Sequence, residues 1–219
     1  MDAITGHFGY ILGGFLVTVE LTVLGYVGAL VLGTVLAVCR VGPITPLRVV
    51  GTGYVEFFRN IPLLALLILF VFGLPDIGLT FSLFGSAAIC LALTGAAYVC
   101  ESVRSGINAV PVGQAEAARA IGLPFAKVLT VVVLPQAFRT MVPPLVNVFI
   151  GMALGSSLAA AIGVPELTNR TQQLNLQYAE AVVTFLVAGA FYVAMAFLGA
   201  GGGRLLERRV GGRGAGGRR

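Results

Sequence analysis

The sequence predicts an all-α integral membrane protein with about five transmembrane helices, an N-terminus outside and a C-terminus in the cytoplasm. Hydrophobic residues make up 58% of the 219 residues and charged residues only 11%, whereas soluble domains carry about 25% charge. The mean hydropathy is +0.97. The apolar stretches are continuous rather than alternating, which favours helices over the strands of a membrane barrel.

Five apolar stretches are long enough, or nearly so, to cross a hydrocarbon core, which needs about 20 residues. They lie within Tyr10–Val38, Val49–Leu74, Phe81–Val103, Val142–Ile162 and Ala179–Ala200. The second stretch contains a polar interruption at Glu56–Asn60. An odd number of spans disfavours two equal inverted repeats, and no repeat is visible in the sequence.

The distribution of positive charge predicts the orientation in the cell membrane. If the N-terminus lies outside, all of the fourteen Lys and Arg residues except Arg59 and Arg170 fall on the cytoplasmic side, as the positive-inside rule requires. No Lys or Arg precedes Arg40, whereas a cleaved signal peptide needs a basic N-terminal region, so we expect the first span to be retained. We expect one transmembrane domain over residues 1–203 and a basic, disordered cytoplasmic tail over residues 204–219, in contact with anionic lipid.

The segment 113–139, GQAEAARAIGLPFAKVLTVVVLPQAFR, is predicted to be cytoplasmic and to form two short helices. Gln114–Ile121 consists mostly of good helix formers and is followed by Gly122, a residue suited to a helix C-terminus. A second helix is expected to begin at Pro124, and Pro135 is expected to stop or kink it.

The first of these short helices displays small residues and a carboxylate. Ala115, Ala118 and Gly122 recur at helical spacing, and Glu116 and Arg119 are three residues apart. A helix of this kind is suited to lying in a groove on another protein. The alternative is an amphipathic helix on the lipid surface, although large apolar anchors are scarce on it.

The same segment resembles the EAA loop of permease subunits of ATP-binding-cassette (ABC) importers. Its pattern is EAA, three residues, a glycine, about nine residues, and then an apolar residue followed by LP. Glu116-Ala117-Ala118, Gly122 and Leu134-Pro135 stand at those places. Further motifs are similar to the polar amino-acid branch: Arg59–Leu64 (RNIPLL), Glu101–Ile107 (ESVRSGI), Leu134–Arg139 (LPQAFR), Pro143-Pro144-Leu145 with Asn147, and Ile162–Leu167 (IGVPEL). The resemblance covers about residues 8–200 and is nearest to actinobacterial glutamate permeases.

This resemblance implies a set of partners and a coupling site. It implies a five-helix permease subunit that pairs with a second permease, two ATPase subunits on the cytoplasmic side and an extracytoplasmic solute-binding protein. The loop over about residues 104–139 would be the coupling loop. The residues expected to contact the ATPase are Glu116, Ala117, Ala118, Arg119 and Gly122. The chain has no GxxxxGK[ST] phosphate loop, so ATP and Mg²⁺ are expected in the partner ATPase and no cofactor in this chain.

One motif departs from the family pattern. Relatives that contact substrate often carry Lys-(Asp/Asn)-Thr-(Ser/Thr) in the fourth span, where this chain has Leu154-Gly155-Ser156-Ser157. The lysine suited to a substrate carboxylate is missing. A heterodimer in which a second permease carries that lysine is therefore the favoured expectation.

Several polar residues are candidates for the translocation pathway or its gate. Arg59 lies about ten residues into the second stretch, roughly 15 Å along a helix, where a charge is costly and suggests function. It either pairs with Glu56 or lines the pathway, where its guanidinium would suit a carboxylate substrate. Glu101 and Arg104 are expected to form an interfacial pair or a gate, and Glu20 to face a subunit interface or the outer vestibule. The full set of pathway candidates is Glu20, Arg59, Asn60, Glu101, Arg104, Asn147, Ser156 and Ser157.

The predicted function is that of a permease subunit of an ATP-driven importer of polar amino acids, with glutamate as the specific candidate. The alternatives are a secondary transporter or channel, which would leave the EAA pattern unexplained, and a non-transporting scaffold. No catalytic arrangement such as HExxH and no metal-ligand spacing is visible, so we expect neither an enzyme nor a metal site. A nucleic-acid partner is not expected either.

Overall fold

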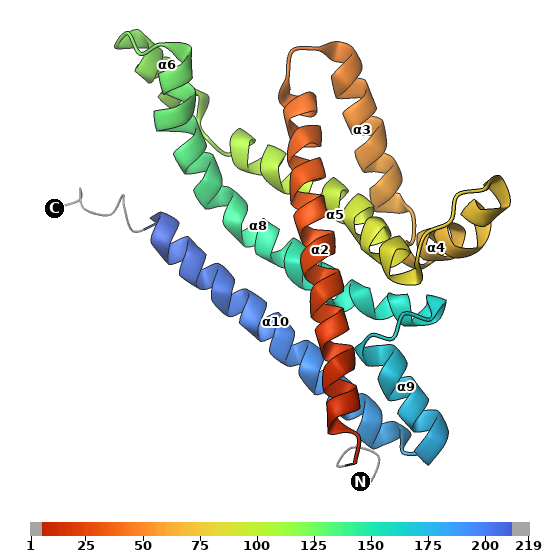
Figure 1. The fold of residues 1–219 in the computed structure, drawn as a ribbon. Coiled ribbons are helices and arrows are strands. Elements are labelled where there is room, and N and C mark those ends of the chain that lie inside the picture. The colour runs from red at the N-terminus through yellow and green to blue at the C-terminus, as the bar shows by residue number, and fades with distance from the viewer. Residues whose placement is uncertain (1–5, 212–219) are drawn as a thin grey trace.

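The chain folds into a tall bundle of helices. The computed structural model describes residues 6–211, and this part of the chain contains helices and turns but no strand. The α-helices are α2 (Phe8–Val41), α3 (Thr45–Asn60), α4 (Leu63–Ile68), α5 (Leu83–Asn108), α6 (Val112–Ala120), α7 (Phe125–Lys127), α8 (Leu134–Gly155), α9 (Leu167–Tyr178) and α10 (Ala181–Gly211). Helix α6 lies at one end of the molecule and α9 at the other (Figure 1).

Four of the five predicted spans are helices that could cross a membrane. Within residues 6–211 these are Phe8–Val41, Leu83–Asn108, Phe125–Ile162 and Ala181–Arg209. The fifth candidate is a bent pair of helices, Thr45–Asn60 with Leu63–Ile77. The predicted all-α membrane fold is confirmed.

The second predicted span, Val49–Leu74, is not one straight helix. Its two halves meet at an angle of 99°, because α3 ends at Asn60 and Ile61 and Pro62 are both extended, with ψ of 131° and 130°. Proline disfavours the helical conformation for the residue before it, so a break at Ile61 follows from the sequence. Arg59 and Asn60 therefore lie at the end of a helix and not in its middle.

The fourth predicted span begins earlier than Val142, and Pro135 does not end a helix. A continuous span runs over Phe125–Ile162, with a π-helical segment at Val128–Val133 directly before Pro135. Pro135 then lies in the first turn of α8, where its missing N–H breaks no α-helical hydrogen bond. A 38-residue span is about 57 Å long, so it extends well beyond a hydrocarbon core of about 30 Å.

The predicted tail also needs a correction. Helix α10 continues through residues 204–211, where Arg204-Leu205-Leu206-Glu207-Arg208 are good helix formers. The expected disorder over this part of the tail is therefore wrong. Residues 212–219 lie outside the described residues.

The core depends on close packing between α2 and α5. Gly33 of α2 lies so near α5 that an added Cβ would be 2.6 Å from the Val99 Cβ and 2.7 Å from the Ala96 carbonyl oxygen. Because the second of these is a backbone atom, the helices would have to separate. The small residue therefore sets the distance between the two helices.

We expect Gly33→Ala to lower the stability of the purified protein by about 1–3 kcal/mol, the usual cost of overpacking a core. Thermal unfolding in detergent measures this loss. Gly53→Ala on α3 is the matched control, because an added Cβ there meets no atom within 4 Å. A melting temperature that falls equally in both variants would contradict the close-packing argument.

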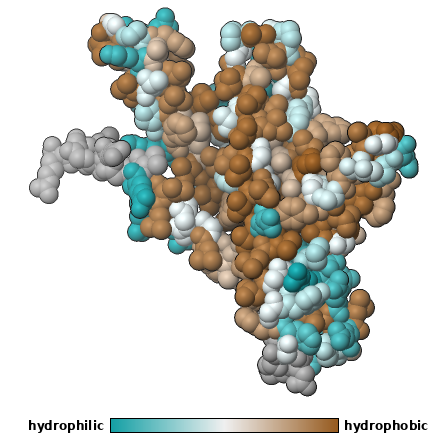
Figure 2. Space-filling view, viewed as in Figure 1, coloured by the Kyte–Doolittle hydropathy of each residue, from teal (hydrophilic) through white to brown (hydrophobic). Residues whose placement is uncertain are grey.

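The surface has an apolar middle and polar ends. In Figure 2 hydrophobic residues cover the central part of the bundle, and hydrophilic residues gather over α9 and at the tip that carries α6. This distribution is that of a protein that crosses a membrane along its long axis. The charge bias predicts that the α6 end is cytoplasmic and the α9 end is outside.

Labelling of single cysteines tests this orientation. Leu176 of α9 and Ile121 beside α6 are both 79% exposed. In right-side-out vesicles that hold the permease alone, Leu176→Cys should react with an impermeant maleimide and Ile121→Cys should react only after the membrane is opened. The background variant would carry Cys39→Ser, since Cys39 is half-buried whereas Cys90 and Cys100 are buried. The opposite pattern of labelling would refute the topology.

Candidate translocation and coupling site

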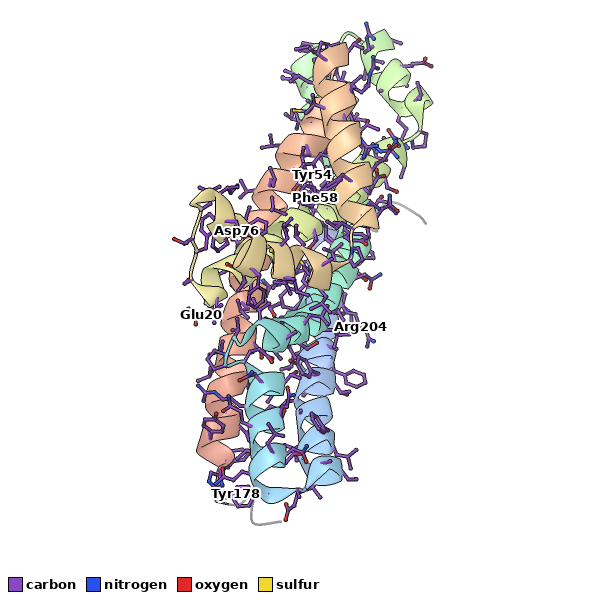
Figure 3. The ribbon with its side chains drawn as sticks, turned by 90° about the vertical axis from the view of Figure 1, so that its right-hand side faces the viewer. Glu20, Tyr54, Phe58, Asp76, Tyr178 and Arg204 are labelled. Atoms are coloured by element: carbon purple, nitrogen blue, oxygen red, sulfur yellow. The ribbon has the colours of Figure 1, made fainter. Side chains whose placement is uncertain are left out.

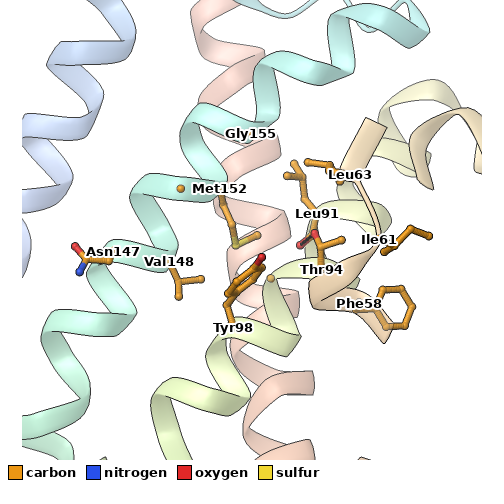
Figure 4. A pocket seen from close by; sticks show the side chains of 12 residues that line it. Phe58, Ile61, Leu63, Leu91, Thr94, Tyr98, Asn147, Val148, Met152 and Gly155 are labelled. Atoms are coloured by element: carbon orange, nitrogen blue, oxygen red, sulfur yellow. Dashed lines mark hydrogen bonds between the residues drawn. The ribbon is translucent and has the colours of Figure 1, made fainter. Parts of the chain in front are cut away.

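An apolar chamber lies where α3 ends, against α5 and α8. Its volume is about 440 Å³, within the range of small-molecule sites. Phe58 comes from the last turn of α3 and Ile61 from the break after it. Leu91, Thr94 and Tyr98 come from α5, and Asn147, Met152 and Gly155 from α8. Figure 4 shows Thr94 and Tyr98 directed into the space between α5 and the end of α3, and Asn147 on α8 directed away from them.

The chamber offers few polar groups. The Thr94 hydroxyl donates to the carbonyl oxygens of Cys90 and Leu91, so it faces the chamber as an acceptor. The Tyr98 hydroxyl and the Asn147 amide are the other polar side chains in the lining. No charged side chain of residues 6–211 lines it.

A second cavity, of about 350 Å³, adjoins the chamber and is strongly polar. Tyr98 belongs to the lining of both cavities. The remaining lining consists of Val55 and of charged or amide side chains, namely Arg40, Glu56, Arg59, Asn60 and Glu101. Neighbouring residues at the end of α3 line different cavities. Phe58 and Ile61 line the chamber, whereas Arg59 and Asn60 line the polar cavity.

Glu101 holds two arginines at one wall of the polar cavity. It forms an ion pair with Arg40 of α2 and another with Arg104, whose Nη2 lies 3.0 Å from Oε2 of Glu101. The predicted pairing of Glu101 and Arg104 is present. Arg40 was missed because only the fold brings residues 40 and 101 together. The cluster ties α2 to the C-terminal part of α5, with Arg104 four residues before the end of that helix at Asn108.

Arg59 and Glu56 do not pair with each other in the described structure. The Arg59 guanidinium instead lies over the ring of Tyr98, 5.7 Å from its centroid, a cation–π contact. No hydrogen bond or ion pair of the Glu56 side chain occurs within the described residues, although its backbone carbonyl accepts from Asn60 Nδ2. The self-satisfied pair considered from the sequence is therefore absent, and one cation and one anion face the cavity.

The other pathway candidates are scattered. Glu20 is exposed on α2 and lies at the margin of the bundle, away from Tyr54 and Phe58 (Figure 3). Ser156 is buried and donates to the Ala153 carbonyl, and Ser157 donates to that of Leu154. Neither serine lines the chamber. Leu154 also lies outside the lining, whereas Gly155 belongs to it.

The sequence reasoning gave no role to Glu166, which is fully buried. Its carboxylate accepts from the Asn169 N–H at 2.8 Å, from the Tyr192 hydroxyl at 2.7 Å and from the Thr18 hydroxyl at 3.2 Å. Burial raises the pKa of this carboxyl, and the hydrogen bonds oppose that rise. Glu166 thus caps α9 and joins it to α2 and α10.

A helix, α6, is present where the coupling helix was predicted, and Gly122 after it adopts the left-handed conformation, with φ of 85°. Ala118 is buried within the chain itself, whereas Glu116, Ala117 and Arg119 are exposed. Neither Glu116 nor Arg119 forms an ion pair within the described residues. The side chains available to a partner at this end also include the strongly exposed Val112, Ile121 and Phe125.

A bundle of membrane-spanning helices with a chamber between them and a projecting helix at one end has the architecture of the membrane subunit of a transporter. Comparison with known families agrees, since the family described as "Binding-protein-dependent transport system inner membrane component" matches residues 29–212. The chain belongs to this family. It is a multi-pass membrane protein, and the predicted family is confirmed.

This chain is similar to several amino-acid permease proteins, and the similarity extends over almost the whole length of each. The probable glutamine permease protein GlnM of Bacillus subtilis is 32% identical over 93% of this chain and 94% of its own length. The L-cystine permease protein TcyB of Bacillus subtilis is 36% identical over 90% of this chain and 85% of its own length. The glutamate permease protein GluC of Corynebacterium efficiens is 35% identical over 90% of this chain and 93% of its own length.

Two solved structures share the fold. The crystal structure of an amino acid ABC transporter with histidines has a TM-score of 0.88 at 30% identity and covers 94% of this chain and 96% of its own. An inward-facing structure of the MetNI methionine ABC transporter has a TM-score of 0.72 at 24% identity, with 94% and 98% covered; at that identity it supports the fold alone.

Proposed function

We propose that this chain is the permease subunit of an ABC importer for polar amino acids, with glutamate as the specific substrate. The observation that carries the proposal is the chamber beside the break in α3, which is of small-molecule size and lies in a bundle that ends in an exposed α6. The names of the relatives support the substrate class, since they include permease proteins for glutamine, arginine, cystine and glutamate.

In this proposal two ATPase subunits bind the α6 end and hydrolyse ATP with Mg²⁺, and a solute-binding protein delivers the amino acid at the α9 end. Closure of the ATPase pair moves α6, and the loop from α5 transmits this movement to the helices around the chamber. Since none of the described residues brings a charged side chain to the chamber, a carboxylate buried there needs a cation from elsewhere. A second permease that carries a lysine supplies it.

Transport by the reconstituted complex tests the proposal. Proteoliposomes would hold this chain, its partner permease and the ATPase, with the binding protein outside and ATP inside. We expect uptake of labelled L-glutamate that requires both ATP and the binding protein. Uptake driven by an ion gradient without ATP would favour a secondary transporter instead.

A further inference from the structure

The polar cavity beside Tyr98 has no role in the proposal above. It is bordered by four charged side chains, of which two are already neutralised, because Arg40 pairs with Glu101 and Glu101 also pairs with Arg104. Arg59 and Glu56 remain without an ionic partner within residues 6–211. The cavity therefore presents one unpaired cation and one unpaired anion from the same turn of α3.

A glutamate and an arginine three residues apart on a helix are neighbours and can pair, yet here the Arg59 guanidinium lies over the Tyr98 ring and leaves Glu56 alone. Both side chains are exposed and line the polar cavity, so a ligand in the cavity can reach both. A ligand that carries both signs close together would neutralise both side chains at once.

We propose that this cavity is a second substrate subsite, which binds the zwitterionic head of an α-amino acid. The Arg59 guanidinium binds the α-carboxylate, which its fork of N–H donors suits. The Glu56 carboxylate binds the α-ammonium, which is charged at pH 7. The inference rests on the proposed function, because the ligand is the amino acid that the transporter carries.

The position of the cavity gives the subsite a place in transport. Tyr98 forms a wall of both cavities, and its ring contacts Arg59. An amino acid that leaves the apolar chamber would displace this contact and meet the charged pair next. The ion pairs of Glu101 with Arg40 and Arg104 keep those arginines from competing for the carboxylate.

Protection of a cysteine from alkylation tests the subsite locally. Asn60→Cys places a thiol in the lining of the polar cavity, in a background in which Cys39, Cys90 and Cys100 are replaced by alanine. In proteoliposomes of the full complex, L-glutamate or L-glutamine should slow the alkylation of this thiol. N-acetyl-L-glutamate, which lacks the ammonium group, should not. Val49→Cys on the exposed face of α3 should show no protection by any of them.

Substitution of the charged pair completes the test. Arg59→Gln should raise the amino-acid concentration for half protection by about tenfold or more, since a charged hydrogen bond is lost, and Arg59→Lys should raise it less. Arg48→Gln, an exposed arginine of the same helix, should leave protection and uptake unchanged. Glu56→Gln should remove the discrimination between L-glutamate and its N-acetyl derivative.

The outcomes separate this inference from the proposed function. ATP-dependent uptake together with no protection of the Asn60→Cys thiol would overturn the subsite and leave the transporter standing. Equal protection by the N-acetyl derivative would overturn the zwitterion as the ligand. Absence of both uptake and protection in the wild-type background would count against both.

Discussion

Glu116→Lys should nearly abolish ATP-dependent uptake and binding of the ATPase, while the permease still inserts into the membrane. Glu116 is exposed on α6 and has no ionic partner within the described chain, so its loss costs the isolated permease little. In a complex, the substitution would put a cation where a carboxylate is expected. A mismatched charge in an interface costs about 2–5 kcal/mol, which corresponds to a 30-fold or larger loss of affinity.

Co-purification of the ATPase with the variant permease, together with uptake, would measure this effect. Glu207→Lys is the matched control, because it makes the same change of charge at an exposed position on α10, which packs against α8 and α9 rather than α6. Undiminished recovery of the ATPase with normal uptake would argue against binding through α6.

The position of α6 could be predicted from local sequence, but the face of α6 that packs against the rest of the chain could not. The run of helix formers before Gly122 and the left-handed conformation of that glycine both follow from short-range preferences. The burial of Ala118 does not, since it depends on how α6 folds back against the segment that begins at Phe125. The sequence therefore locates the helix, and the structure shows that Glu116, Ala117 and Arg119 are the exposed part of the motif.

The charged residues show the same division between local and long-range information. The pair Glu101 and Arg104 follows from spacing on one helix, whereas Arg40 joins them across 61 positions of sequence. The break after α3 was signalled by Pro62, but its angle of 99° depends on the packing of α4 against α5. The burial of Glu166 could not be predicted locally, because two of its three hydrogen-bond donors, Thr18 and Tyr192, come from distant segments.

This chain should transport poorly when it is expressed with only the ATPase and the binding protein. The described part of the chain puts no charged side chain in the lining of the chamber, so a homodimer would offer no cation from these residues there for the substrate carboxylate. An unpaired buried charge costs several kcal/mol. Robust uptake without any second permease would overturn the proposed heterodimer.

The double substitution Leu154→Lys with Gly155→Asn gives this prediction a second test, because it introduces the Lys-Asn pair that the resemblance leads us to expect in a subunit that contacts substrate. Gly155 lines the chamber, and the Cβ of a larger residue there would have only an ordinary contact, 3.5 Å from Leu63 Cδ2. Leu154 is exposed on α8, and Leu154→Ala alone should be mild in the complete transporter. If the missing cation is what limits the homodimer, the double variant should take up L-glutamate without the second permease. Uptake as poor as that of the unmodified homodimer, from a variant that still binds the ATPase, would show that the partner contributes more than a lysine.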